Sequence, residues 1–249
     1  MMIPKYKFYD LFHKSSSLQT KLVSEKNFTY RIVFSILNQV LRNKNNLDIL
    51  DFGCGSGTLS LYFASKGNNV VGIDISPKVI RTAKASASRL DLRKELNFFT
   101  LNEGKRKIKG QRFDLILCIE VLEHIKNDEV LLRFFSSHLK KSGYLILSTP
   151  SKNAPLYKIG LTKNFDKRVG HLRRYNLKSL EKVFLRANLK VKDSKKTEGI
   201  IRNSLFVIPF LGRFIKFLKG PLSDLFTFLD QLTIPLLGES DIFVVAQKK

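Results

Sequence analysis

Residues 120–124 read E-V-L-E-H and place two carboxylates and an imidazole within five positions. They follow an apolar run that predicts a buried β-strand. If the chain turns helically after that strand, Glu120, Glu123 and His124 share one face at i, i+3 and i+4. Converging carboxylates and imidazoles can hold a divalent metal ion, and His171, in R-V-G-H-L-R-R-Y-N, is a candidate fourth ligand.

These side chains fit two kinds of chemistry. A bound metal ion would lower the pKa of an alcohol or phenol and so help it become a nucleophile. Without a metal, the carboxylates would orient a cofactor or substrate, and His124 or His171 would act as a general base, because imidazole titrates near neutral pH. We therefore take Glu120, Glu123, His124 and His171 both as candidate catalytic residues and as candidate metal ligands.

A glycine-rich segment further upstream predicts a nucleotide-binding element. Residues 47–52 are mostly apolar and run into Gly53, and a helix-patterned segment and a second short strand ending at Asp74 follow. Strand, glycine loop, helix, strand and acid make a βαβ nucleotide-binding unit. Gly53, Gly55 and Gly57 let the backbone approach a ligand, and Asp74 lies where a carboxylate accepts both hydroxyls of a ribose.

The pattern D-x-G-C-G-x-G over residues 51–57, with the acid at 74, resembles motif I of the class I S-adenosylmethionine (SAM)-dependent methyltransferases. Thr58 stands where the dinucleotide fingerprint has its third glycine, and no Walker lysine follows the loop. The segment L-K-K-S-G-Y-L-I-L-S-T-P-S resembles the family's fifth strand. The resemblance covers about residues 30–196 and the last strand. It implies a Rossmann-like α/β fold with seven strands, mostly parallel and with the last antiparallel, and helices on both faces.

The same resemblance implies a set of contacts to SAM. Asp51 would help hold the ammonium group, and Ile75 would touch the adenine. Asn102 stands twelve residues before Asp114, at the position where the family usually has an aspartate for the adenine amine, and its carbonyl can still accept a hydrogen bond. The cofactor-binding positions are then Asp51, Gly53, Cys54, Gly55, Gly57, Asp74, Ile75, Asn102 and Ile119.

The E-x-x-E-H stretch is similar to that of two methyltransferase groups that use a metal ion. They are the O-methyltransferases of ubiquinone biosynthesis and the small-RNA 3′-terminal 2′-O-methyltransferases. The first resemblance implies methylation of a hydroxyl on a small-molecule or lipid-linked acceptor. An RNA 2′-O-methyltransferase and a SAM-binding regulator without catalysis are the alternatives.

The chain has a formal net charge of +23, and residues 151–249 carry 20 Lys and Arg against 8 Asp and Glu. Such a surface suits nucleic acid, an anionic membrane or a phosphorylated substrate, although the codon bias of an AT-rich genome explains it equally well. The two cysteines form no disulfide framework, and the N-terminal stretch has no apolar run of signal-peptide length. We expect a cytoplasmic protein, with peripheral attachment to a membrane as the alternative.

The order of elements predicts a single domain with four parts. Residues 1–46 are expected to form an N-terminal helical cap, and the resemblance to the methyltransferases implies that segment 6–12 folds over the SAM pocket. Residues 47–198 form the SAM-binding core, and residues 239–249 form the last strand.

Residues 199–238 are expected to be a helical insertion between strands six and seven, or a lid. The insertion is either a helical cap packed on the domain, or a basic and aromatic surface that docks on a membrane or covers an apolar substrate. The residues that suggest membrane contact are Phe210, Arg213, Phe214, Lys216 and Phe217.

Overall fold

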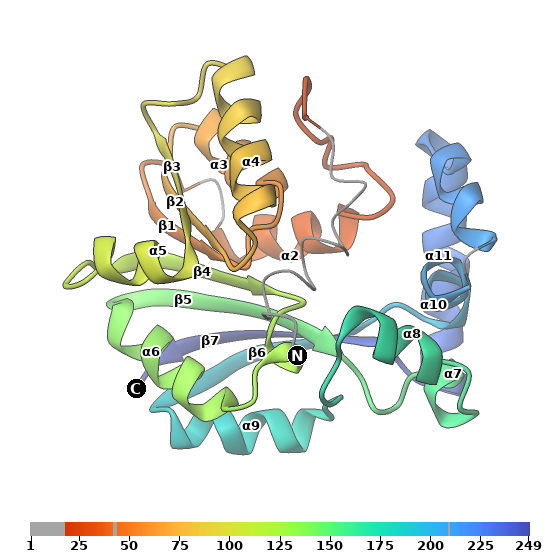
Figure 1. Cartoon of the computed structure of the whole chain (residues 1–249). Coiled ribbons are helices and arrows are strands. Elements are labelled where there is room, and N and C mark those ends of the chain that lie inside the picture. Colours follow the sequence, from red (N-terminus) through yellow and green to blue (C-terminus); the bar gives the residue numbers. More distant parts are fainter. Residues whose placement is uncertain (1–17, 42–43, 209) are drawn as a thin grey trace, which may run out of the picture.

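The computed structural model describes residues 18–41, 44–208 and 210–249 (Figure 1). Its central sheet has seven strands in the order β3-β2-β1-β4-β5-β7-β6, and β7 runs antiparallel to both of its neighbours. This topology confirms the predicted fold class. The strands are β1 (Asp48–Phe52), β2 (Asn69–Asp74), β3 (Leu96–Thr100), β4 (Phe113–Ile119), β5 (Leu139–Pro150), β6 (Leu189–Thr197) and β7 (Asp241–Lys248).

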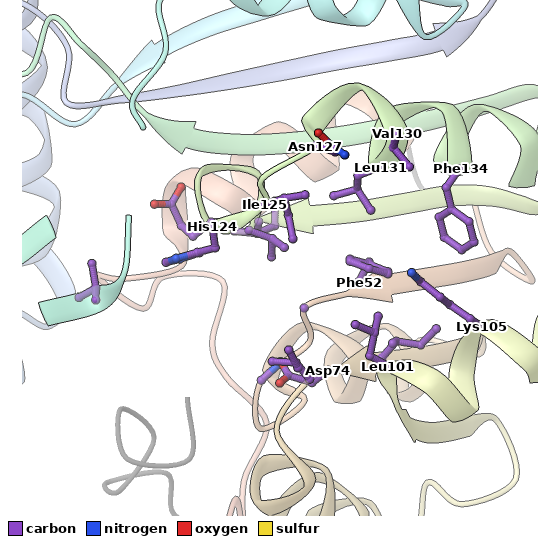
Figure 2. A pocket seen from close by; sticks show the side chains of 18 residues that line it. Phe52, Asp74, Leu101, Lys105, His124, Ile125, Asn127, Val130, Leu131 and Phe134 are labelled. Carbon is purple, nitrogen blue, oxygen red and sulfur yellow. The ribbon is translucent and has the colours of Figure 1, made fainter. Parts of the chain in front are cut away.

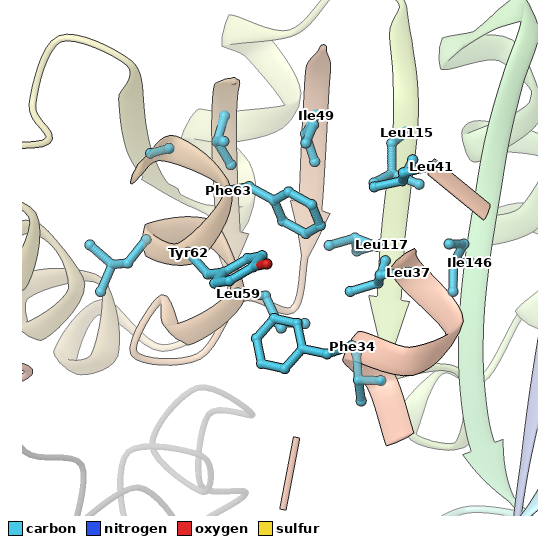
Figure 3. Packing of buried hydrophobic residues seen from close by; sticks show 14 of the residues in the cluster. Phe34, Leu37, Leu41, Ile49, Leu59, Tyr62, Phe63, Leu115, Leu117 and Ile146 are labelled. Atoms are coloured by element: carbon cyan, nitrogen blue, oxygen red, sulfur yellow. The ribbon is translucent and has the colours of Figure 1, made fainter. Parts of the chain in front are cut away.

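Helices cover both faces of the sheet and bury an apolar cluster on each side. Along β4, Leu115 and Leu117 belong to one cluster and Ile116 and Cys118 to the other, because successive strand residues point to opposite faces. Figure 3 shows the first cluster, where Phe34 lies against residues of the neighbouring helix and strands. The helices on that face are α2 (Arg31–Leu41), α3 (Thr58–Ser65) and α4 (Pro77–Arg89), and those on the other are α5 (Leu101–Lys107), α6 (Asp128–His138) and α9 (Leu177–Arg186).

The loop between β1 and α3 has a backbone that glycine adopts most readily. Gly53, Gly55 and Gly57 have φ angles of 83°, 53° and 85°. A Cβ atom on Gly57 would lie 2.6 Å from the ring of Phe98, and one on Gly53 would lie 2.2 Å from the side chain of Val121. The first and third glycines therefore let the loop pack closely against its protein neighbours, while Gly55 has open space around it.

The boundary between α6 and β5 lies before the Ser142–Gly143 pair. The helix α6 ends at His138, and β5 already begins at Leu139. Leu139 is fully buried and pairs with Phe113 of β4. Burial of this leucine therefore draws the chain into the sheet before Gly143 can end a helix.

Several helices gather at the end of the sheet toward which β5 points (Figure 1). Two of them, α7 (Pro155–Lys158) and α8 (Lys163–Val169), follow β5 and were not predicted. The expected insertion between β6 and β7 contains α10 (Ile200–Val207), η3 (Leu211–Phe217) and α11 (Gly220–Leu237). Within the described ranges, no helix is both long and apolar enough to cross a bilayer.

The glycine loop gives a first prediction. Gly57→Ala should lower the free energy of unfolding by about 2–5 kcal/mol, because alanine disfavours a positive φ and its methyl group would overlap Phe98. Gly67→Ala is the matched control, since Gly67 has a φ of 76° and nothing within 4 Å of the added atom. That control should lose only about 1–2 kcal/mol in urea unfolding. Equal losses for the two variants would contradict the close packing at Gly57.

Candidate active site

A cavity of about 540 Å³ opens at the carboxyl ends of β1, β2 and β4 (Figure 2). Gly53, Gly55 and Asp74 line it from the predicted nucleotide-binding unit. Figure 2 shows side chains of α6 facing Leu101 across the cavity, with His124 far from Phe134. Its volume suits a ligand the size of a nucleoside derivative.

Asp74 binds the glycine loop as well as lining the cavity. Its carboxylate accepts hydrogen bonds from the backbone N–H groups of Gly55 at 3.0 Å and Ser76 at 2.8 Å. It thus fixes the loop to the end of β2 and to the first turn of α4. Its position is compatible with the predicted ribose contact, and Ile75 lines the same cavity.

The chain after β4 does not form the helix that would align Glu120 with Glu123 and His124. Glu120 has a left-handed φ of 55°, and only residues Leu122–His124 form a short 3-10 turn, η2. The Glu120 carboxylate instead accepts a hydrogen bond from the Ser148 hydroxyl at 2.6 Å. The expectation that all four candidate metal ligands converge was therefore wrong for Glu120.

The other three candidates do come together. The Oε1 atom of Glu123 lies 3.6 Å from Nε2 of His124 and 3.9 Å from Nε2 of His171. One ligand atom from each residue can be chosen so that all lie within 4.8 Å of one another. Glu123 is fully buried, and Thr149 donates a hydrogen bond to its Oε2 atom at 3.0 Å. Its Oε1 atom is buried and has no hydrogen-bond partner.

In each histidine, the hydrogen-bond partner of the Nδ1 atom fixes the tautomer of the ring. His124 Nδ1 lies 3.0 Å from the carbonyl oxygen of Gly170, which can only accept, so this nitrogen carries the proton. His171 Nδ1 lies 2.8 Å from Oδ1 of Asp166. In the neutral rings both Nε2 atoms then turn a lone pair toward Glu123. This arrangement is typical of histidines that bind a metal ion.

Asp166 is a residue that the sequence analysis missed. Arg174 also donates to it, at 2.6 Å. Although burial opposes its ionisation, the hydrogen bonds from His171 and Arg174 lower the pKa of Asp166 to about 2. Asp166 precedes His171 by five residues, a spacing that matches neither helix nor strand periodicity, so the sequence offered only a weak signal.

Burial holds the pKa of Glu123 well above its usual range, and the nearby charge of Glu120 raises it further. A buried carboxylate without a compensating charge is costly, so Glu123 takes up either a proton or a cation. The three-residue cluster can therefore hold a divalent ion or a proton.

A second cavity, of about 430 Å³, shares a wall with the first. Ile119, Glu120, His124 and Val169 line both. The second cavity extends between α2, α8, α10 and β7 and includes His171. Among its other lining residues are the polar side chains of Tyr30, Glu198, Asn203 and Asp241.

The comparisons with known proteins agree with this geometry. A model of the methyltransferase domain family matches residues 25–194. The chain belongs to the methyltransferase domain family. A ubiquinone biosynthesis O-methyltransferase from Rickettsia akari is 28% identical over 153 residues, which are 61% of this chain and 56% of that protein. The chain spans about half the length of the curated relatives it matches.

Solved methyltransferases share the fold at low sequence identity. The magnesium protoporphyrin IX methyltransferase of Synechocystis PCC 6803, with bound S-adenosylhomocysteine (SAH), matches with a TM-score of 0.59 and 16% identity, over 98% of this chain and 94% of that one. A SAM-dependent methyltransferase from Mesorhizobium loti matches with a TM-score of 0.57 and 15% identity, over 86% of this chain and 97% of that one. At these identities the likeness shows the fold alone.

Four of the predicted cofactor residues do not line the first cavity. Asp51 is buried and accepts a hydrogen bond from the Ser60 hydroxyl at 2.5 Å. Gly57 packs on Phe98, and Cys54 is a free, partly buried thiol. Asn102 is exposed in the first turn of α5, where Leu101 and Lys105 line the cavity instead, so the expected adenine contact by Asn102 finds no support here.

The N-terminal segment reaches the glycine loop from outside. The Gln19 side chain donates hydrogen bonds to the backbone oxygen of Ser56 at 3.1 Å and to the Thr58 hydroxyl at 3.0 Å. The predicted cover over the cavity, residues 6–12, lies outside the part of the chain that the structure describes. Gln19 therefore lies beside the glycine loop, which lines the cavity proposed for the cofactor.

The cavity gives a second prediction, which separates Asp74 from Asn102. Asp74→Ala should weaken SAH binding by about 1–3 kcal/mol, because it removes a charged acceptor and also loosens the glycine loop. Asn102→Ala should bind SAH as the wild type does, because Asn102 lies outside the cavity. Isothermal titration calorimetry measures both affinities. Unchanged affinity in Asp74→Ala would contradict the assignment of the cofactor cavity.

The buried carboxyl of Asp51 gives a third prediction. Burial raises the pKa of Asp51 to about 6, and the nearby charge of Asp74 adds to this. Because the folded state then binds its proton more tightly than the unfolded chain, stability falls as pH rises from about 4 to 6. Between pH 4 and pH 7, the free energy of unfolding of the wild type should therefore fall by about 2 kcal/mol more than that of Asp51→Asn. Chemical unfolding at the two pH values measures this difference.

The control for this measurement is Asp193→Asn, which changes an exposed aspartate of β6. Its unfolding free energy should follow the wild-type pH dependence. If Asp51→Asn also follows the wild-type curve, the pKa of Asp51 is not raised in the folded protein and the prediction is wrong.

Proposed function

We propose that the protein transfers the methyl group of SAM to a hydroxyl group of an acceptor held in the second cavity. The observation that carries this proposal is the wall common to the two cavities, which includes Glu120 and His124. A methyl donor on one side and an acceptor on the other would meet at this wall. Because the sulfonium of SAM is already a good leaving group, alignment of the two reactants supplies much of the catalysis.

An oxygen nucleophile must also lose its proton. In their neutral tautomers, the Nε2 atoms of His124 and His171 carry no proton, so either can accept the proton of the hydroxyl. Gly170 and Asp166 hold the two rings in these tautomers. Both histidines line the second cavity, where the acceptor hydroxyl would lie.

The residues present also fit a divalent metal ion. Glu123, His124 and His171 would hold it, since the Oε1 atom of Glu123 is buried without a partner and two imidazoles face it. One carboxylate and two imidazoles form a common catalytic ligand set for zinc and related ions. When bound, the ion would lower the pKa of an acceptor hydroxyl.

The second cavity favours a hydroxylated small-molecule or lipid-linked acceptor. Glu198, Asp241 and Asn203 offer oxygen atoms that accept hydrogen bonds, while Phe165 and Phe206 provide apolar surface. The likeness to proteins named ubiquinone biosynthesis O-methyltransferases supports an acceptor of this mixed character.

The two alternatives receive less support from the site. An RNA acceptor would bring phosphates toward Glu120, Glu198 and Asp241, which offer phosphate no cation, while Arg174 in the same lining is already paired with Asp166. The net charge of +23 therefore does not make this cavity a phosphate site. A regulator that only binds SAM would not require two histidines whose tautomers are fixed beside the buried carboxylate of Glu123.

The proposal is tested by incubating the full chain with radiolabelled SAM and fractionated cell extract. Label should enter a small-molecule or lipid fraction through an oxygen–methyl bond. Label in RNA would overturn the acceptor class, and no transfer to any fraction, with SAM binding intact, would favour the regulator.

The metal cluster gives a fourth prediction. His171→Asn should lower the bound divalent metal, measured by elemental analysis, from about one ion per chain to well below that, because one of three ligands is lost. His138→Asn is the matched control, since His138 lies at the end of α6 away from both cavities. If no metal co-purifies and chelation leaves turnover unchanged, the cluster acts as a proton acceptor instead.

A further inference from the structure

The long helix α11 presents its polar face to the protein and its apolar face to the outside. Its buried residues are Ser223, Thr227 and Asp230. Leu232 is 55% exposed and Leu236 is 85% exposed. A surface helix normally has the opposite arrangement, because burial of apolar side chains is what stabilises it.

Polar contacts hold α11 in this orientation. Arg31 donates to the hydroxyl of Ser223 at 2.7 Å. The carboxylate of Asp230 accepts the backbone N–H groups of Gly199 at 2.7 Å and Arg202 at 2.9 Å. Turning the apolar face inward would break all of these bonds and leave the backbone N–H groups of Gly199 and Arg202 without their acceptor. The outward apolar face is therefore built into the fold.

Neighbouring elements extend this apolar surface. In η3, Phe214 is 54% exposed and Phe217 is 63% exposed. Just after α7, Ile159 is 67% exposed, and Lys158 donates to the backbone oxygen of Leu237 at 3.3 Å, which places α7 beside the end of α11. We call this surface, formed by η3, α11 and residues 157–161, the apolar face. Phe226 of α11 also packs in one cluster with Leu211 and Ile215 of η3, so these elements adjoin. Exposed apolar side chains gathered on adjoining elements mark an interaction site.

The charges next to the apolar face are positive. Arg213, Lys216 and Lys219 lie within or directly after η3, and none of them takes part in an ion pair among the residues the structure describes. Both acids of α11 are already engaged, because Asp224 pairs with Arg31 and Asp230 is buried. The surface therefore combines exposed leucines and phenylalanines with uncompensated cations.

We propose that the apolar face docks on the surface of an anionic lipid bilayer. Aromatic and leucine side chains would enter the interface while the cations contact anionic headgroups, as in other amphipathic surface helices. A second copy of the chain fits less well, because pairing the same face would bring Arg213, Lys216 and Lys219 of both copies together. Docking would also set the second cavity near the bilayer, since α10 lines that cavity and packs against α11.

Flotation of the full-length protein with vesicles tests this proposal. The protein should float with vesicles of phosphatidylcholine and phosphatidylglycerol at low salt, and much less with phosphatidylcholine alone or at high salt. Leu232→Gln should weaken the binding about tenfold. Its matched control is Leu185→Gln on α9, because Leu185 is equally exposed, at 57%, but lies outside the apolar face and should leave binding unchanged.

The charge contribution has its own pair of variants. Arg213→Gln with Lys216→Gln should weaken binding to the anionic vesicles about thirtyfold at low salt. The matched control is Arg93→Gln with Lys94→Gln, which removes the same number of charges from an exposed turn before β3. This control should weaken binding to the anionic vesicles much less.

Two results would overturn the proposal. One is no flotation with anionic vesicles at low salt by a wild-type protein that still binds SAH. The other is a stable dimer in sedimentation that Leu232→Gln converts to a monomer, which would assign the face to a second copy. Neither result depends on the methyl acceptor, so failure here leaves the proposed function untouched.

Discussion

The buried carboxylate of Glu123 is the constraint on which the arrangement of the site depends. It lies in η2, shortly after β4, is fully buried and has one oxygen without a hydrogen-bond partner. To keep such a group inside the protein, the fold brings His124 and His171 to its Oε1 atom and Thr149 to its other oxygen. His171 reaches this place only because α8 and the loop after it fold back over η2, where the backbone N–H of Leu172 donates to the carbonyl of Glu123.

The protein separates its charges between outside and inside. Its surface is strongly basic, with a net charge of +23, while the wall around the two cavities carries Glu120, Glu198 and Asp241, and the buried Glu123 lies close to His124 and His171. Burial and the neighbouring carboxylates raise the pKa of Asp241 well above its usual range. Crowded acids in a basic protein suit a site that receives a sulfonium, a metal ion or a hydroxylated acceptor, and they disfavour phosphates.

The sequence predicted those parts that depend on local signals. The glycine spacing and the acid at 74 correctly located the loop and Asp74, because βαβ geometry brings them together at one edge of the sheet. The prediction for Glu120 was wrong because its own backbone is left-handed, which turns it away from the expected helical face. No sequence pattern marks such a residue. The outward face of α11 could not be foreseen either, since the leucine spacing fixes the apolar side of the helix but not the direction in which it points.

We propose that methyl donor and acceptor meet at the wall shared by the two cavities. A crystal structure of the protein with SAH tests this meeting point most directly. SAH should occupy the first cavity, with its ribose at Asp74 and its sulfur atom facing the gap between Glu120 and His124. A sulfur atom pointing toward Phe134 and α6, away from the second cavity, would rule out methyl transfer to an acceptor held there.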